Sequence, residues 1–261
     1  MEGMCGRYSL SRTRRELIEQ FHVQLDAAGD AVRPDYNIAP TKEVLAVLAR
    51  PPQEETHAAE ASVPAVRQLR ALRWGLVPSW AKDVKIGNRL INARAETVHE
   101  KPSFRRAFAK RRCLLPADGF YEWYTMERNG GRPAKQPFFI RPRDGAVMAM
   151  AGLYELWRSP EDDQWLWTCT IITTQASDDV GRIHDRMPMV VRPDDWDAWL
   201  DPALTDVARV RDLLTPAMSG TMEAYPVSRA VNNVKNNGPE LLQPLTDGHI
   251  PGENSGSGTL F

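Results

Sequence analysis

Apolar residues along the chain recur in two patterns, and each pattern predicts a different kind of element. Short runs rich in β-branched and aromatic residues, bounded by turn-forming residues, predict strands. These runs are 44–48, 70–74, 113–115, 120–124, 138–141, 147–154 and 165–174. Because strands dominate and do not alternate regularly with helices, the sequence predicts an α+β fold, built on antiparallel sheet with a few peripheral helices.

Three stretches have the signals of short helices. Thr13 and Glu16 form a capping-box pair in front of apolar residues at helical spacing. Ser103 is expected to cap a short basic helix, and Pro193 to open a third helix with acidic residues in its first turn. The predicted loops are 36–40, 51–62 and 75–85.

Composition narrows the class of protein. The chain has 261 residues, of which 42% are hydrophobic and 26% charged, as expected for a globular domain. It has no apolar run of membrane-spanning length, and its start does not resemble a signal peptide. Three cysteines without a CxxC pair argue against a disulfide framework or a metal site and favour a cytoplasmic protein. We expect one domain over 5–247, a leader or misassigned start at 1–4, and a disordered tail at 248–261.

The net charge of −1 means that nucleic-acid binding would have to come from a local patch. One basic segment is visible between residues 101 and 112. A run of this kind is usually a solvated helix face, and phosphate binding is the alternative. Its cations are Lys101, Arg105, Arg106, Lys110, Arg111 and Arg112.

Cys5 follows a methionine near the start of the chain and could therefore become the N-terminal residue. It would then carry a thiol and an α-amine, with pKa values of about 8.5 and about 8, on adjacent carbons. Such an aminothiol captures aldehydes, because the amine forms a Schiff base that the thiol closes to a thiazolidine. A buried or incidental cysteine near a terminus is the alternative.

Four polar segments hold side chains that a core would not select. Asn92, Arg94 and Glu96 alternate, so they would share one face of an extended strand. Glu122 lies among aromatic residues, where desolvation favours a proton-transfer role, and His184 offers an imidazole in a loop. Each also has a structural interpretation: a turn for Asn92, an ion pair for Glu122, and a loop hydrogen bond for His184. The fourth segment has donors suited to phosphates, at Ser228, Arg229, Asn232, Asn233 and Lys235.

Seven motifs occur in a fixed order: CGRY at 5–8, YNIAP at 36–40, RWGLVP at 73–78, NAR at 92–94, DGFYEW at 118–123, HDRMP at 184–188 and PVSR at 226–229. Together they resemble the SRAP family (SOS response-associated peptidases) over residues 4–245. The resemblance implies a single domain around a curved antiparallel sheet. It also implies protection of abasic sites in single-stranded DNA by a covalent crosslink, with no metal or organic cofactor and no need for a partner subunit.

The resemblance also implies roles for individual residues. Cys5 matches the nucleophile, Asn92 the amide that orients its amine, and Glu122 and His184 the groups that move protons. Trp80 resembles an aromatic wedge at a junction of single-stranded and duplex DNA, although Ala81 replaces the second aromatic residue that can follow it. Further DNA contacts are implied for Arg7, Asn37, Arg94, Ser228, Arg229 and Lys235.

The four residues before Cys5 decide whether this chemistry is available. Removal of the initiator methionine alone would expose Glu2. Either translation begins at Met4, or the protein removes the segment by self-cleavage, or the segment is foreign to the natural protein. With the segment retained no imine can form, because the nitrogen of Cys5 is then an amide.

Two other functions fit the same residues. Cys5, His184 and a carboxylate suffice for a cysteine peptidase acting on other proteins. A non-covalent binder of single-stranded or modified DNA would need only the basic groups. The ending Leu260-Phe261 loosely resembles peptides that dock on bacterial sliding clamps, which would bring a bacterial protein of this kind to the nucleoid.

Overall fold

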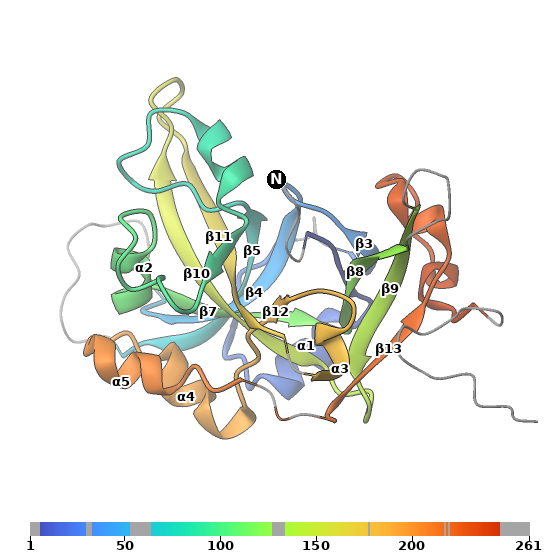
Figure 1. Cartoon of the computed structure of the whole chain (residues 1–261). Coiled ribbons are helices and arrows are strands. Elements are labelled where there is room, and N and C mark those ends of the chain that lie inside the picture. Colours follow the sequence, from blue (N-terminus) through green and yellow to red (C-terminus); the bar gives the residue numbers. More distant parts are fainter. Residues whose placement is uncertain are drawn as a thin grey trace, which may run out of the picture.

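Two sheets organise the chain in the computed structural model, which describes residues 6–29, 33–52, 64–126, 134–176, 178–216, 218 and 220–245 (Figure 1). The smaller sheet has the strand order β13–β9–β8–β1–β3, and its pairings are antiparallel. Its strands are β1 (Tyr8–Leu10), β3 (Asp35–Ile38), β8 (Gly119–Met126), β9 (Ala134–Pro142) and β13 (Met222–Pro226).

The larger sheet has the order β12–β11–β10–β7–β4–β5–β2, and β6 pairs with β11 beside this path. The long strands β10 and β11 form a hairpin whose outer end projects beyond the rest of the sheet (Figure 1). The strands are β2 (Leu25–Asp26), β4 (Glu43–Arg50), β5 (Val66–Trp74), β6 (Asn92–Arg94), β7 (Arg112–Ala117), β10 (Met148–Arg158), β11 (Trp165–Gln175) and β12 (Arg186–Pro188).

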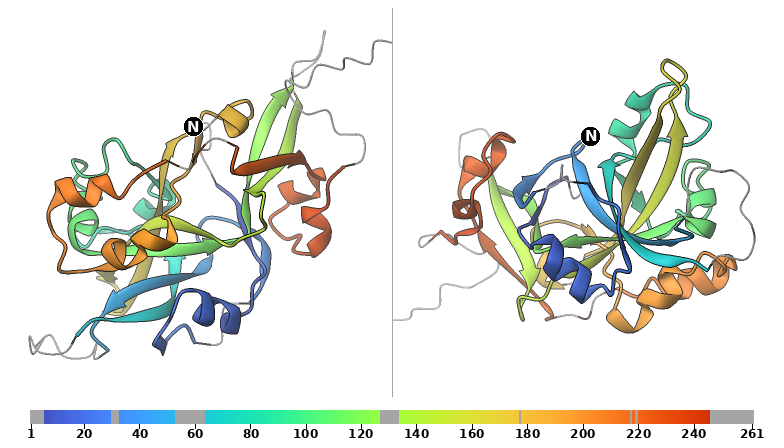
Figure 2. Two further views of the ribbon diagram at one scale, coloured as in Figure 1. Left: turned by 90° about the horizontal axis from the view of Figure 1, so that it is seen from below. Right: turned by 180° about the vertical axis from the view of Figure 1, so that it is seen from behind.

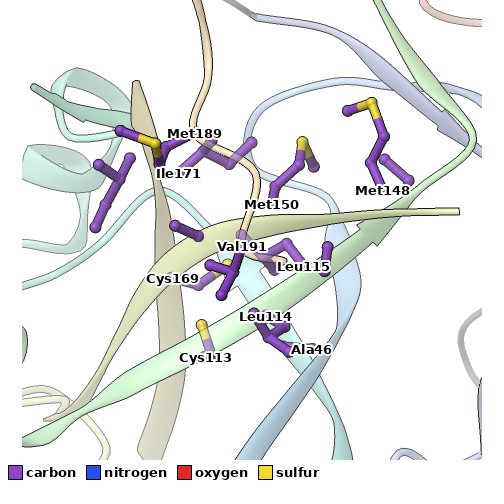
Figure 3. Packing of buried hydrophobic residues seen from close by; sticks show 14 of the residues in the cluster. Ala46, Cys113, Leu114, Leu115, Met148, Met150, Cys169, Ile171, Met189 and Val191 are labelled. Atoms are coloured by element: carbon purple, nitrogen blue, oxygen red, sulfur yellow. The ribbon is translucent and has the colours of Figure 1, made fainter. Parts of the chain in front are cut away.

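The larger sheet closes on itself. Besides β10, β11 also pairs in parallel with the end of β5, where Thr168 lies opposite Arg73. The strands β5, β4, β7, β10 and β11 therefore form a closed ring. Figure 3 shows buried side chains of this region, with Cys113 and Cys169 among them. Gly152 of β10 has no room for a side chain, because a Cβ there would lie 2.9 Å from the Cys113 sulfur.

The smaller sheet packs on the ring through aromatic residues. Tyr8 of β1 is buried and contacts Trp74 of β5 edge to face, with ring centroids 5.3 Å apart. Tyr8 and Phe120 belong to the same hydrophobic cluster as the interior of the ring. A second, small cluster lies on the other face of the smaller sheet and contains Tyr121 and Val231. The smaller sheet is thus covered on both faces.

Short helices lie around the sheets (Figure 2). The α-helices are α1 (Arg14–Gln20), α2 (Arg105–Lys110), α3 (Asp178–Gly181), α4 (Trp196–Leu200) and α5 (Val207–Asp212). The 3-10 helices are η1 (Val84–Arg89), η2 (Pro193–Asp195), η3 (Arg229–Asn232) and η4 (Pro239–Leu242). In the described ranges, none of the helices has the length and apolar character needed to cross a lipid bilayer.

The structure confirms the α+β fold, the seven strands and two of the three helix starts that the sequence predicts. The capping box of α1 is complete, because the Thr13 hydroxyl accepts from the Glu16 amide while the Glu16 carboxylate accepts from the Thr13 amide. Pro193 opens η2, which leads into α4.

Two expectations are wrong. Ser103 does not cap α2: the N-cap is Phe104, which makes no side-chain capping bond, and burial of its ring holds the helix in place instead. Residues 36–38 are not a loop, because β3 pairs with β1 from Ile38, opposite Tyr8, to Asp35.

Candidate functional site

Glu122 is a buried acidic residue on β8, with only 1% of its surface exposed. Side chains alternate along a strand, so Glu122 shares a face with Phe120, while Tyr121 and Trp123 point to the other face. Phe120 belongs to the main core, and so does Phe138, which lies opposite Glu122 on β9. The carboxyl group therefore faces inward, on the side of the smaller sheet that packs against the ring.

The register of β1 directs the start of the chain toward Glu122. Tyr8 lies opposite Phe120, and the amide of Tyr121 donates to the Arg7 carbonyl at 2.9 Å. One further step of this register would place Gly6 opposite Glu122. Cys5 itself lies outside the described residues.

The Arg7 side chain lies on the outer face of the smaller sheet, with Trp123. Its Nη1 donates to Asn37 Oδ1 at 2.7 Å and to the Val231 carbonyl at 2.8 Å. The guanidinium carbon lies 5.6 Å from the centre of the Trp123 ring. Burial lowers the pKa of Arg7 from its ordinary value. Arg7 thus joins the start of β1 to the C-terminal part of the chain.

Asn37 is fully buried and holds the loop that follows η3. Its amide nitrogen donates to three backbone carbonyls, those of Val231, Asn233 and Asn236. Trp123 supports the same loop, since its ring nitrogen donates to Asn232 Oδ1 at 2.7 Å. The burial of Asn37 does not fit the DNA contact expected for it. Trp123 received no role from the sequence, although it stands inside the DGFYEW motif.

The segment held by Asn37, which consists of η3 and the loop after it, carries the cations expected to contact phosphate. Arg229 and Lys235 are exposed, and neither forms an ion pair with a described residue. The Ser228 hydroxyl caps η3 by accepting from the amide of Ala230 at 3.2 Å. The two cations therefore extend from a backbone that is fixed from within.

Asn92 and His184 lie at different points of β11. On one side, β6 runs parallel to β11, with Asn92 opposite Ile171 and Arg94 opposite Thr173. On the other side lies β12, whose first residue, Arg186, is opposite Gln175 at the end of β11, so His184 lies past the end of that strand. The Arg94 side chain is exposed, and Asn92 is half-buried.

Arg186 joins the two flanks of β11. Its guanidinium donates to both carboxylate oxygens of Glu96, at 2.6 and 2.9 Å, and to the Thr173 carbonyl at 2.7 Å. The hydrogen bonds from Arg186 lower the pKa of Glu96. The strand that was predicted to hold Asn92, Arg94 and Glu96 on one face is shorter than expected, because β6 ends at Arg94 and Glu96 lies in a turn. The sequence assigned no role to Arg186, since its partners are distant along the chain.

His184 makes two polar contacts through Nδ1. The backbone amide of Arg186 donates to it at 3.1 Å, and a carboxylate oxygen of Asp185 lies 3.2 Å away. The first contact requires Nδ1 without a proton and the second requires Nδ1–H, so the two contacts belong to different protonation states of the ring. The loop that bears His184 follows α3, which packs against β13 of the smaller sheet. The two sheets meet at this loop.

Trp80 is 55% exposed on the loop between β5 and η1. The next residue, Ala81, is tied to the β10–β11 hairpin, because the Trp157 ring nitrogen donates to its carbonyl at 2.7 Å. Gly75, at φ +127°, packs so closely on Gly87 that a Cβ would lie 2.7 Å from the Gly87 carbonyl oxygen. The loop therefore displays Trp80 on a fixed backbone.

The geometry thus has three parts: Glu122 on the inner face of the smaller sheet, a group around Arg7 on its outer face, and the surroundings of β11, with Asn92 beside the strand and His184 in the loop past its end. A family model described as SOS response associated peptidase (SRAP) matches residues 4–234. The chain belongs to the SRAP family. The resemblance predicted from the seven motifs is confirmed.

Relatives of this SRAP chain cover it almost completely. It is 41% identical over 240 residues to the abasic site processing protein YoqW of Bacillus subtilis strain 168, with 92% of this chain and 99% of YoqW covered. It is 36% identical to the abasic site processing protein HMCES of Gallus gallus, with 85% and 69% covered. A solved structure of a protein from Bacteroides thetaiotaomicron shares the fold, with a TM-score of 0.74 over 92% of this chain and 100% of that chain, at 23% identity.

Proposed function

We propose that this SRAP protein shields abasic sites in single-stranded DNA by a covalent crosslink through Cys5. Two relatives at 41% and 36% identity are named abasic site processing proteins. The observation that carries the proposal is the register of β1 on β8. It leads the start of the chain toward the buried carboxyl group of Glu122.

The chemistry needs only the open-chain aldehyde of the abasic sugar. The α-amine of Cys5 adds to the aldehyde carbon and gives a carbinolamine, which loses one water to form an imine. The thiolate of Cys5 then adds to the imine carbon, and the nitrogen takes up a proton. The product is a thiazolidine in which carbon–nitrogen and carbon–sulfur bonds replace the carbonyl.

Glu122 and His184 are the proton-transfer groups in this scheme. Glu122 gives the proton that lets the carbinolamine oxygen leave as water. His184, in its protonated form, gives the Nε2 proton to the sugar ring oxygen as the ring opens, while the Glu122 carboxylate takes the proton of the anomeric hydroxyl. Asn92 orients the amine. Most of the acceleration comes from holding the amine against the aldehyde, which contributes roughly 7 kcal/mol or more in well-oriented intramolecular reactions.

The DNA backbone is held by exposed cations and one aromatic residue. Arg94, Arg229 and Lys235 contact phosphates without sequence preference. Trp80 stacks on a base at a strand junction, a contact that is worth about 1–3 kcal/mol per base. Arg7, Asn37 and Ser228 act indirectly, because their hydrogen bonds fix the segment that carries Arg229 and Lys235.

The scheme requires a free amine at Cys5. The protein reaches it by translation from Met4 followed by removal of that methionine, or by autocatalytic removal of residues 1–4. In the second route the thiol attacks the Met4 carbonyl, the peptide bond breaks to give a thioester and the free amine, and water hydrolyses the thioester. The second route is the peptidase activity of this chain. N-terminal analysis of protein from its native host tests this point: a retained leader together with crosslinking contradicts the scheme.

Intact-mass analysis with an abasic single-stranded oligonucleotide tests the crosslink. The expected adduct has the mass of both components minus one water. Cys5→Ala and Cys5→Ser both eliminate the thiazolidine and keep the α-amine, so each gives at most an imine that persists only after borohydride reduction. Cys169→Ala is the control, because Cys169 is buried in the ring. An adduct undiminished in Cys5→Ala overturns the proposal.

Non-covalent binding to single-stranded DNA is the competing function. It predicts salt-sensitive affinity that survives Cys5 substitution, without any stable adduct. Docking of Leu260 and Phe261 on a sliding clamp remains a prediction, since both residues lie outside the described part of the chain. Loss of clamp pull-down on deletion of the two residues is its test.

A further inference from the structure

The structure divides the six cations of residues 101–112 into two kinds. Arg111 binds Glu155 at 2.6 Å, and Arg112 is buried, with its guanidinium donating to backbone carbonyls such as that of Trp199 at 2.7 Å. The other four side chains are exposed: Lys101, Arg105, Arg106 and Lys110. We call these four residues the α2 face.

The α2 face has no acidic partner. The segment 101–112 contains no Asp or Glu. Within the described ranges, none of its four side chains forms an ion pair or a hydrogen bond. Arg112 differs from these four residues, because its guanidinium donates five hydrogen bonds to backbone carbonyls and so holds α2 to α4 and to the segment after α4.

The charges of α2 also oppose the helix that carries them. Arg105 and Arg106 stand at the positive N-terminal end of the helix dipole, where acidic residues are favourable, and the first turn has none. Arg106 and Lys110 are four residues apart, about 6 Å along the helix, so like charges repel on one face. The buried side of the helix, Ala107 and Phe108, keeps it folded in spite of these charges. Stability of the isolated protein does not explain this arrangement.

From these observations we infer that the α2 face is a second binding surface for nucleic-acid phosphates. Phosphate contacts require cations only, whereas the centre of a protein interface is normally apolar or aromatic. None of the exposed large hydrophobic residues of the described chain falls between residues 99 and 112. The identity of the polyanion as DNA rests on the proposed function.

The α2 face lies away from the smaller sheet. In Figure 1 and in the rear view of Figure 2, α2 and the strands β8, β9 and β13 stand on opposite sides of the closed ring. A short oligonucleotide bound beside Glu122 cannot cover both surfaces. The α2 face therefore holds DNA that flanks the lesion, and it acts only on long substrates.

The test compares two triple variants with equal charge change. The α2 variant carries Arg105→Gln, Arg106→Gln and Lys110→Gln. The control carries Arg15→Gln, Arg143→Gln and Arg192→Gln, which are exposed on other elements. Each protein is titrated with an intact 40-base-pair duplex at several salt concentrations. Each is also reacted with a 7-nucleotide abasic strand.

We expect the α2 variant to bind the duplex roughly tenfold more weakly at 0.1 M salt. Its plot of log affinity against log salt should become less steep by about 2.7, because three phosphate contacts are lost and each accounts for about 0.9. Crosslinking of the short strand should be unchanged, and the melting temperature should not fall. The control should match the wild type in every measurement.

Three results would overturn the inference: equal duplex binding by both variants, loss of short-strand crosslinking in the α2 variant, or tighter binding of polyglutamate than of duplex at 0.15 M salt. The result of the duplex-binding test does not depend on whether the proposed crosslinking function is correct. Duplex titration does not involve Cys5, so a protein that forms no crosslink still gives a valid answer.

Discussion

At the scale of single residues, Glu122 combines deep burial with a position on β8 beside β1, the strand that leads to the start of the chain. In the proposed reaction, Glu122 acts by transferring a proton, and the size of its side chain plays no part. Glu122→Gln keeps the side-chain volume and removes the titratable group. We expect crosslinking to slow about 100-fold, within the usual range for a general acid or base. Single-turnover measurement of adduct formation checks this, and an unchanged rate would contradict the assigned role.

Arg186 and Glu96 give a residue-scale prediction about pH. Their hydrogen bonds lower the pKa of Glu96 from its ordinary value of 4.5, so the folded state binds this proton less readily than the unfolded state does. The resulting stabilisation is present above pH 4.5 and is lost as the pH falls through the lowered pKa. Because the Glu96 side chain is 51% exposed, we expect Glu96→Gln to cost under about 1 kcal/mol at pH 7. Chemical denaturation at pH 7 and pH 3 measures it, and a difference that grows at pH 3 would contradict it.

Single residues also show which parts of the site could be predicted from the sequence and which could not. Cys5, Asn92, Glu122 and His184 could be singled out because amide, carboxyl and imidazole groups stand next to turns or aromatic residues. Arg112 and Arg186 could not be separated from ordinary surface cations, because the carbonyls and the carboxylate that bind them are as much as 92 residues away. The DNA contact of Asn37 was expected from the family resemblance alone, and its hydrogen bonds to carbonyls near position 233 could not be predicted from the residues around it.

At the scale of elements, the sequence predicted those helices and strands whose formation depends on neighbouring residues. The capping box of α1 and the strands with many β-branched and aromatic residues follow from neighbouring residues and were predicted correctly. The short strand β3 was missed, because its pairing with β1 is a tertiary contact. The N-cap of α2 was misplaced for a similar reason: burial of Phe104 outweighs the intrinsic preference of Ser103.

The loop that displays Trp80 gives a prediction at this scale. Gly75→Ala would combine a left-handed backbone with a collision at Gly87, so we expect a loss of stability of about 3 kcal/mol, the upper end for local strain. Gly145→Ala is the matched control, because Gly145 also has a positive φ, +70°, but nothing within 4 Å of a Cβ. It should cost about 1 kcal/mol. Thermal denaturation compares the two, and equal losses would show that the approach to Gly87 does not matter.

At the scale of the whole molecule, closure of the ring makes its interior intolerant of added volume. Gly152→Ala would place a methyl group 2.9 Å from the Cys113 sulfur and from a methyl carbon of Leu115. We expect a cost of about 1–3 kcal/mol, typical of overpacking. Cys113→Ala in the same protein should restore part of this loss, because it removes one of the two obstacles. Denaturant titration of the single and double variants decides it, and simple additivity would contradict the packing explanation.

The place of β1 in the smaller sheet has a mechanical consequence. It is hydrogen-bonded to β8 on one side and to β3 on the other. If DNA is attached at the amino end, a motor protein that collides with the adduct pulls on this strand, and two neighbours share the load. When a single molecule is pulled from its amino end, the sheet should resist until the hydrogen bonds from β1 to β8 and to β3 break together. If the DNA were attached to an edge strand, which has a neighbour on one side only, that strand would peel away at a lower force.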